Sequence, residues 1–199
     1  MEIKLTNKGE EVKNLQKLLY LKTDGIFGPI TEQAVKDFQL LVGIKPTGVY
    51  DDATNYKLKT SPFKLSKRTI NEIIIHCSAT EEGKSYKVDD IRKWHIAKGY
   101  SEIGYHYVVY IDGSVHTGRN INLMGAHCVN HNSKSIGICY VGGLKNGKPY
   151  DTRNKEQKES LIALLRLLKR MYPNAKIYGH RDFANKSCPC FDTKEYNNL

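Results

Sequence analysis

The sequence lacks several features that would place the protein in a membrane or among disulfide-stabilised domains. Its 199 residues contain no run of about 18 apolar residues, so we expect no membrane span. The first ten residues contain no apolar signal core, and we therefore expect synthesis in the cytoplasm without use of the general secretory route. Five cysteines cannot all pair with one another, which favours reduced thiols over a disulfide framework.

The first sixty residues lack histidine, cysteine and any clustered pair of acids, so we expect no catalysis there. Apolar residues recur at helical spacing over 12–19 and 34–42. A turn containing glycine follows each of these stretches and leads into the next helix. We predict a small all-α module over residues 1–60. A linker over 61–68 follows, because that segment has no periodicity.

The net charge of +10 is unevenly distributed along the chain. Residues 1–60 hold 9 basic and 8 acidic residues, whereas 61–199 hold 22 basic and 13 acidic ones. A basic globular unit suggests a polyanionic partner, such as nucleic acid, a membrane surface or an acidic cell wall. A solvated surface rich in lysine also explains most of this charge. No recognisable nucleic-acid-binding motif is present, so we expect no nucleic-acid partner.

Residues 69–199 have the pattern of one α/β domain. Apolar segments at Ile70–Ile75 and 135–143 predict buried strands. The segment Tyr105–Ile111, followed by Asp-Gly, predicts a strand that enters a hairpin. Helical spacing predicts helices over Val88–Lys98 and Glu156–Tyr172. The expected fold is a mixed central sheet flanked by helices.

The segment 179–190 places an imidazole, an ammonium and two thiols within twelve residues, on a loop that follows a short apolar strand. Zinc takes imidazole nitrogen and thiolate sulfur, and a catalytic zinc has three protein ligands and one open position. His180 and Cys188 supply two ligands, and His76, where the first strand stops, is the candidate for the third. Cys77 points to the opposite side of that strand and is expected to be a small buried residue. Cys190, two residues after Cys188, remains an alternative ligand. Two thiolates on one zinc would be typical of a structural site.

The N-terminal region resembles the peptidoglycan-binding modules of cell-wall hydrolases over residues 4–58. The shared positions are Gly9-Glu10-Glu11-Val12, Leu15-Gln16-Lys17-Leu18-Leu19, Asp24-Gly25-Ile26-Phe27-Gly28-Pro29, Thr31, Ala34-Val35, Phe38-Gln39, Gly48 and Thr54. This resemblance implies that the module binds the cell wall.

Residues 69–196 resemble the zinc amidases of the phage-lysozyme and peptidoglycan-recognition type. The matching motifs are Ile75-His76-Cys77-Ser78-Ala79-Thr80, Ile91-Arg92 with Trp94-His95, Ile103-Gly104-Tyr105-His106-Tyr107, Asp112-Gly113, Gly125-Ala126-His127, Asn132, Ser135-Ile136-Gly137-Ile138, Val141-Gly142-Gly143, Gly179-His180 and Cys188-Pro189 with Phe191-Asp192.

This second resemblance implies cleavage of the amide between N-acetylmuramic acid and L-alanine in peptidoglycan. The protein could be a phage lysin, a prophage remnant or a bacterial wall-remodelling enzyme, and the lack of a signal sequence favours a phage-type endolysin. It implies Zn²⁺ held by His76, His180 and Cys188, with Tyr105 and Lys186 assisting catalysis. We expect a monomer that acts on the cell wall, and we expect His127 to line the substrate groove. A structural role for His127 is an equal alternative. His95, His106, His116 and His131 are interpreted as packing or surface residues.

Three other classes of protein fit the sequence less well than an amidase does. Non-catalytic peptidoglycan receptors share the fold but typically lose the cysteine ligand, which is present here as Cys188. A thiol hydrolase that uses Cys77 or Cys188 lacks an orienting pattern around either thiol. Muramidase chemistry requires a pair of carboxylates, and the candidate metal ligands offer a simpler account.

Overall fold

A computed structural model describes residues 2–199, so Met1, with which the predicted N-terminal module begins, lies outside the described residues. The chain divides into two compact units. The first contains the residues up to Lys64 and the segment Ile162–Pro173, and the second contains Leu65–Leu161 and Asn174–Leu199. Across residues 2–199, every helix is too short or too polar to cross a membrane.

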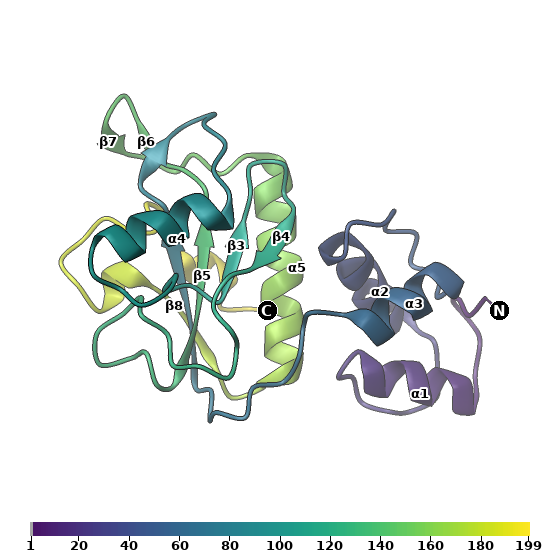
Figure 1. Cartoon of the computed structure of the whole chain (residues 1–199). Helices are drawn as coiled ribbons and strands as arrows, with labels where there is room; N and C mark the ends of the chain where they lie inside the picture. The colour runs from purple at the N-terminus through teal and green to yellow at the C-terminus, as the bar shows by residue number, and fades with distance from the viewer. Residues whose placement is uncertain (1) are drawn as a thin grey trace. The chain divides into compact units, whose positions relative to one another are not determined.

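The first unit contains the three short helices expected from the apolar spacing (Figure 1). They are α1 (Glu10–Leu18), α2 (Pro29–Leu41) and α3 (Asp52–Thr60). Val12, Leu15, Val35 and Phe38 are almost fully buried and form part of its core. Pro29 begins α2 at a position where the missing N–H costs nothing. The prediction of an all-α N-terminal region is confirmed.

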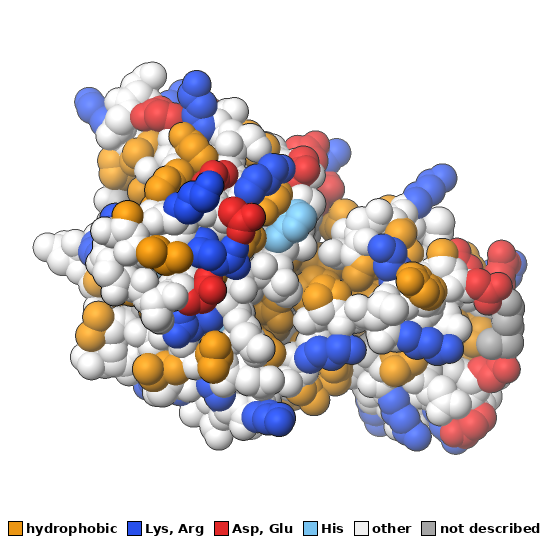
Figure 2. Space-filling view, viewed as in Figure 1, with side chains coloured by type: hydrophobic (Ala, Val, Ile, Leu, Met, Phe, Trp, Pro, Cys, Tyr) orange, Lys and Arg blue, Asp and Glu red, His pale blue; other side chains and the backbone are white. Residues whose placement is uncertain are grey.

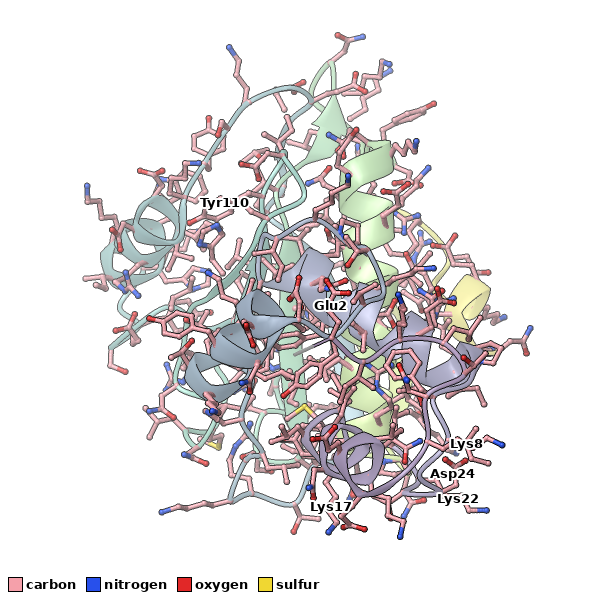
Figure 3. All side chains as sticks on the ribbon, turned by 90° about the vertical axis from the view of Figure 1, so that its right-hand side faces the viewer. Glu2, Lys8, Lys17, Lys22, Asp24 and Tyr110 are labelled. Carbon is pink, nitrogen blue, oxygen red and sulfur yellow. The ribbon has the colours of Figure 1, made fainter. Side chains whose placement is uncertain are left out.

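Two buried glutamines, Gln16 and Gln39, make the same four hydrogen bonds. Each Oε1 accepts the N–H of a turn glycine at 2.9 Å, and each Nε2 donates to a turn side chain, a backbone carbonyl and a threonine hydroxyl. The partners are Asp24, Gly25, Ile26 and Thr31 for Gln16, and Thr47, Gly48, Val49 and Thr54 for Gln39. Each partner of Gln39 lies as many residues after the corresponding partner of Gln16 as Gln39 itself lies after Gln16. The module is therefore an internal repeat of one turn-and-helix unit. Asp24 lies at the edge of the module, near Lys8 and Lys22 (Figure 3).

The second unit is built on a five-stranded mixed sheet in the order β4-β3-β5-β1-β8. Its strands are β1 (Glu72–Cys77), β3 (Tyr107–Val109), β4 (Val115–Thr117), β5 (Ser135–Tyr140) and β8 (Lys176–Gly179). The central strand β1 pairs in parallel with β5 and with β8, and β3 pairs in parallel with β5. Only β4 is antiparallel, and its hairpin with β3 was predicted from the Asp-Gly turn. The mixed sheet is confirmed.

Helices cover both faces of this sheet (Figures 1 and 3). On one face lies α4 (Val88–Ala97), which buries Val88 and Ile91 against Val108 and Tyr110. On the other lies α5 (Lys155–Met171), the longest helix, whose first residues belong to this unit. The remaining elements are a small second sheet of β2 (Thr80–Glu81), β6 (Gly143–Lys145) and β7 (Lys148–Pro149), and the 3-10 turns η1 (His180–Asp182) and η2 (Thr193–Tyr196).

Two strands begin later in the chain than the apolar pattern predicts. The strand expected over Ile70–Ile75 runs from Glu72 to Cys77, because its pairing with β5 continues through His76 and Cys77. His76 therefore lies within the strand and not beyond its end. The next expected strand begins at Tyr107, where pairing with β4 begins, which leaves Tyr105 outside the regular sheet.

Basic side chains do not form one continuous patch on the face shown in Figure 2. There, Lys and Arg side chains of the second unit alternate with Asp and Glu side chains and with apolar surface. Arg92 on α4, for example, pairs with Asp89 and with Glu102. Surface pairs of this kind contribute little to stability.

Candidate active site

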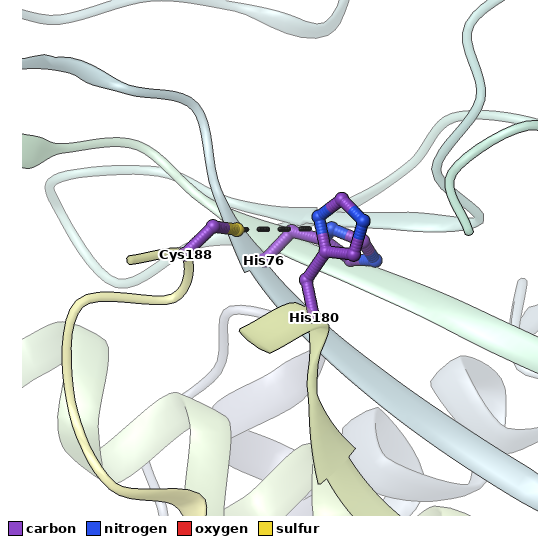
Figure 4. A group of neighbouring side chains, drawn as sticks. All are labelled: His76, His180 and Cys188. Carbon is purple, nitrogen blue, oxygen red and sulfur yellow. Dashed lines mark hydrogen bonds between the residues drawn. The ribbon is translucent and has the colours of Figure 1, made fainter. Parts of the chain in front are cut away.

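Three potential metal ligands converge at the carboxyl edge of the parallel strands. His76 comes from β1, His180 follows β8 directly, and Cys188 lies on the loop beyond it (Figure 4). Their ligand atoms all lie within 4.8 Å of one another. Ligands at the end of parallel strands meet because those strands end at one edge of the sheet. The structure thus brings together the three residues chosen from the sequence.

The distance between two of the candidate ligand atoms is close to that expected in a tetrahedral zinc site. Zn–N bonds of about 2.05 Å and a Zn–S bond of about 2.3 Å at tetrahedral angles place nitrogen and sulfur about 3.6 Å apart. The observed distance from Cys188 Sγ to His76 Nδ1 is 3.8 Å. The donor set of two imidazoles and one thiol also suits zinc, and leaves room for one more ligand.

Both histidines of the cluster are held in the neutral form that binds metal. Burial lowers the pKa of His76 well below its ordinary value, and the neighbouring His127 and His180 add to this effect. Burial, and then the positive charge of Lys186, lowers the pKa of His180. A neutral imidazole has a free lone pair, so neither residue has to lose a proton when a cation binds at neutral pH.

His127 contacts the cluster through His76. Its Nδ1 lies 3.0 Å from His76 Nε2, and its Nε2 lies 3.3 Å from Ser135 Oγ. The backbone N–H groups of His127 and Cys128 both donate to Asn132 Oδ1. The side chain is buried, and both ring nitrogens have protein atoms within hydrogen-bonding distance. A role for His127 in the substrate groove stays a prediction.

Tyr105 lies next to the cluster, with its ring centroid 5.1 Å from that of His76. The side chain is half-buried. Burial raises the pKa of Tyr105 well above its ordinary value, and the nearby thiols Cys139 and Cys188 contribute. The phenol is therefore protonated at neutral pH and can act as a hydrogen-bond donor near the candidate ligands.

Lys186 is exposed on the loop two residues before Cys188. Its ammonium is close enough to lower the pKa of both His76 and His180 by charge repulsion. The one hydrogen bond found for its backbone is donated to Ala184 at 2.7 Å. Lys186 thus brings positive charge to the site from an exposed position on the loop that carries Cys188.

The two other thiols near the site contact each other. Cys190 Sγ lies 3.7 Å from Cys77 Sγ, and within residues 2–199 the candidate metal cluster comprises His76, His180 and Cys188. Cys77 is buried, as expected from its place in the strand. Its backbone N–H donates to Cys188 Sγ at 3.3 Å.

The loop that carries Cys188 is anchored by Arg153, which the sequence did not single out, and by a close contact at Gly179. The guanidinium of Arg153 lies 3.1 Å from the ring centroid of Phe191 and donates to Glu195 and to the hydroxyl of Tyr196. Gly179 lies so close to Pro189 that a Cβ would be 2.7 Å from the proline ring. Arg153 also pairs with the neighbouring Asp151, but its partners on the C-terminal loop lie about forty positions away along the chain, so no local signal indicates this anchoring role.

The remaining histidines have structural hydrogen bonds. His95 Nδ1 accepts the N–H of Gly104 at 2.9 Å, and His106 Nδ1 accepts that of Gly137 at 3.0 Å. His131 Nδ1 lies 2.8 Å from a carboxylate oxygen of Glu72. His116 is exposed. These positions agree with the interpretation of the four histidines as packing or surface residues.

Comparison with known proteins agrees with this geometry. Residues 66–191 match the N-acetylmuramoyl-L-alanine amidase family, and residues 8–58 match a family of peptidoglycan binding domains. The endolysin of Escherichia phage T7 is 37% identical over 135 residues, which cover 67% of this chain and 89% of that protein. Peptidoglycan-recognition protein SC2 of Drosophila melanogaster is 34% identical over 132 residues, covering 63% and 68% of the two chains.

Among solved structures, the endolysin N-acetylmuramoyl-L-alanine amidase LysCS from Clostridium intestinale matches with a TM-score of 0.58 and 29% identity. The match covers 68% of this chain and 87% of that one. The family match extends over more than half of the chain, and it includes the cluster at the carboxyl edge of the sheet. The chain therefore belongs to the N-acetylmuramoyl-L-alanine amidase family and is an amidase of the phage-endolysin type.

Proposed function

We propose that the protein is a zinc-dependent amidase in which His76, His180 and Cys188 hold the metal. The observation that carries this proposal is the convergence of their ligand atoms within 4.8 Å at one edge of the sheet. The neutral state of both imidazoles supports it. The substrate is the amide between N-acetylmuramic acid and L-alanine of peptidoglycan.

The reaction must overcome the low reactivity of water toward an amide. When bound, zinc supplies a Lewis acid that polarises the scissile carbonyl and activates water at neutral pH. Negative charge then develops on the former carbonyl oxygen, and the ammonium of Lys186 is placed to stabilise it. Tyr105, protonated because of its raised pKa, donates a hydrogen bond to the reacting oxygen atoms. Both are catalytic residues in this proposal.

The N-terminal module serves as an anchor to the cell wall. We assign residues 1–60 to this module, 61–68 to a linker and 69–199 to the catalytic domain. The match of residues 8–58 to peptidoglycan binding domains supports the assignment. A second binding site on the same chain raises the effective concentration of the enzyme at an insoluble substrate. Deletion of residues 1–60 should weaken sedimentation with insoluble peptidoglycan and leave hydrolysis of a small soluble muropeptide nearly unchanged.

Digestion of purified peptidoglycan tests the proposed reaction. The amidase should release new N-terminal L-alanine without new reducing sugar ends, and reducing ends would assign the protein to the glycosidases. A chelator should abolish the activity, and Zn²⁺ should restore it. Binding of peptidoglycan without any new chain end would identify a non-catalytic recognition protein, and full activity after exhaustive chelation would contradict the metal assignment.

A further inference from the structure

We infer that His127 is a positioning residue that fixes His76 in the tautomer needed for metal binding. In this arrangement His76 Nε2–H donates to His127 Nδ1, and His76 Nδ1 keeps its lone pair for the metal. The inference rests on the proposed zinc site, but it concerns the arrangement of protons in the protein itself.

The two nitrogens of His76 face different partners. Nε2 lies 3.0 Å from His127 Nδ1, whereas Nδ1 lies 3.8 Å from Cys188 Sγ. A neutral imidazole carries one proton, and the hydrogen bond made by one nitrogen decides which nitrogen is free to bind a metal. The side chain of His76 is fully buried, so bulk water cannot replace His127 as the acceptor. If the proton were on Nδ1, it would occupy the ligand position.

The surroundings of His127 accommodate the matching tautomer. With Nδ1 as acceptor, its proton is on Nε2, which faces Ser135 Oγ at 3.3 Å. Ser135 is fully buried at the start of β5. Hydrogen bonds from the backbone of His127 and Cys128 to Asn132 Oδ1 fix the segment that carries the ring. The chain from Ser135 through His127 to His76 is therefore consistent at every step.

Two glycines form a socket for the ring of His127. A Cβ added at Gly125 or at Gly137 would lie 2.5 Å from His127 Cδ2, which is shorter than any ordinary contact. The ring thus occupies space that any other residue at these two positions would fill. Such close fitting is what holds a supporting side chain in one orientation.

Because its hydrogen-bond partner is a neutral histidine, His76 is oriented in a way that also affects the net charge at the metal site. Metal-binding histidines commonly donate to a carboxylate, a backbone carbonyl or water. A neutral imidazole orients His76 without placing a negative charge beside the metal. Cys188 then remains the one ligand of the three that can be anionic, and a bound dication keeps net positive charge for polarising a carbonyl.

The test compares full-length His127→Leu with His127→Asn. Leucine has a similar size but no acceptor, whereas the Oδ1 atom of asparagine can take the place of Nδ1. Zinc affinity is measured by competition with a chelating indicator. His127→Leu should bind zinc about 10–100-fold more weakly, and His127→Asn should recover most of this loss. Long-range ¹H–¹⁵N correlation spectra of the metal-free wild type should show the proton of His76 on Nε2.

Several outcomes would overturn the inference. They are wild-type zinc affinity in His127→Leu, no recovery in His127→Asn, or a proton on Nδ1 of His76 in the metal-free protein. Normal zinc affinity combined with a raised KM in both variants would assign His127 to the substrate groove. If His127→Leu does not fold, the asparagine variant and the tautomer measurement decide. Peptidoglycan cleavage by wild type that binds no zinc would refute the proposed function, while the tautomer measurement would still test His127.

Discussion

Gly137, in the middle of β5, is the position where one added methyl group should disturb the site most directly. A Cβ there would lie 2.5 Å from Cδ2, 2.6 Å from Cγ and 2.7 Å from Nε2 of His127, whereas ordinary contacts begin at 3.4 Å. The strand has little freedom to move away. Gly137 pairs with Ile74 of β1, its N–H donates to Nδ1 of His106 at 3.0 Å, and its carbonyl accepts the N–H of His106 at 2.9 Å. The ring of His127 must therefore move by nearly 1 Å.

The expected cost of Gly137→Ala has two parts. Overpacking of a buried site typically destabilises a protein by about 1–3 kcal/mol. Displacement of the ring also breaks the 3.0 Å contact with His76, and loss of such support lowers metal affinity about 10–100-fold. That loss corresponds to about 1.4–2.7 kcal/mol of binding free energy. Gly125→Ala meets the same ring from a loop, which can yield, so its effect should be smaller.

The assay measures the free energy of unfolding of the metal-free protein and its zinc dissociation constant, for wild type and Gly137→Ala. Gly28→Ala is the control, because a Cβ there meets no atom within 4 Å and its φ of −98° suits any residue. Gly28 is the N-cap of α2, where alanine is less favourable than glycine, so the control should lose at most about 1 kcal/mol of stability and should keep the zinc affinity of wild type. Wild-type stability and zinc affinity in Gly137→Ala would show that the ring has room to move, and would refute the reasoning.

Four further predictions follow from the contacts of single residues. Lys186→Ala should keep stoichiometric zinc by metal analysis and lose about 10²–10³-fold in kcat; loss of zinc would contradict this. Cys190→Ser should also keep zinc, because its sulfur contacts a buried thiol outside the cluster; loss of zinc would make it a ligand. Gln39→Leu removes four hydrogen bonds and should destabilise the module by about 2–3 kcal/mol, measured by amide exchange; unchanged exchange would argue against the network. Hydrogen bonds from Gln16 and the backbone lower the pKa of Asp24, so Asp24 stabilises the module above the ordinary aspartate pKa, and this stabilisation is lost as the pH falls through the lowered pKa. Asp24→Asn should therefore reduce the dependence of the module's stability on pH, measured by amide exchange. An unchanged dependence in this variant would contradict a contribution from Asp24.

Much of the site could be predicted because its ligands have unusual chemistry in an informative local setting. His180 and Cys188 follow a strand on one loop, and His76 lies in an apolar β-branched run. These residues can be recognised from short segments of sequence, so knowledge of the fold is not needed to select them. The resemblance to zinc amidases added Tyr105 and Lys186, whose residue types alone would have favoured a sheet aromatic and a surface lysine.

The supporting contacts could not be predicted, because they join residues far apart in the sequence. The bond between His76 and His127 depends on a long connection that returns to the sheet, and on the absence of a side chain at Gly137. The contact of Arg153 with Phe191 likewise depends on how the C-terminal loop returns. Strand boundaries were displaced by up to three residues, since pairing with a neighbour and not the apolar run decides where a strand ends; the strand predicted over 135–143, for example, ends at Tyr140.

His76 and Cys188 each have their own support from the protein, and these supports come from different elements. His76 is held by the pairing of β1 with both neighbours and by its contact with His127. Cys188 is held by the N–H of Cys77 at its sulfur and by the N–H of Arg181, which donates to its carbonyl at 2.7 Å. None of these bonds involves a metal. These bonds help to hold both side chains near the candidate site, which reduces the binding energy that must be spent on arranging them. Because the ordering cost falls on the fold, a change such as Gly137→Ala is expected to lower stability and metal affinity together, whereas Lys186→Ala affects the rate alone.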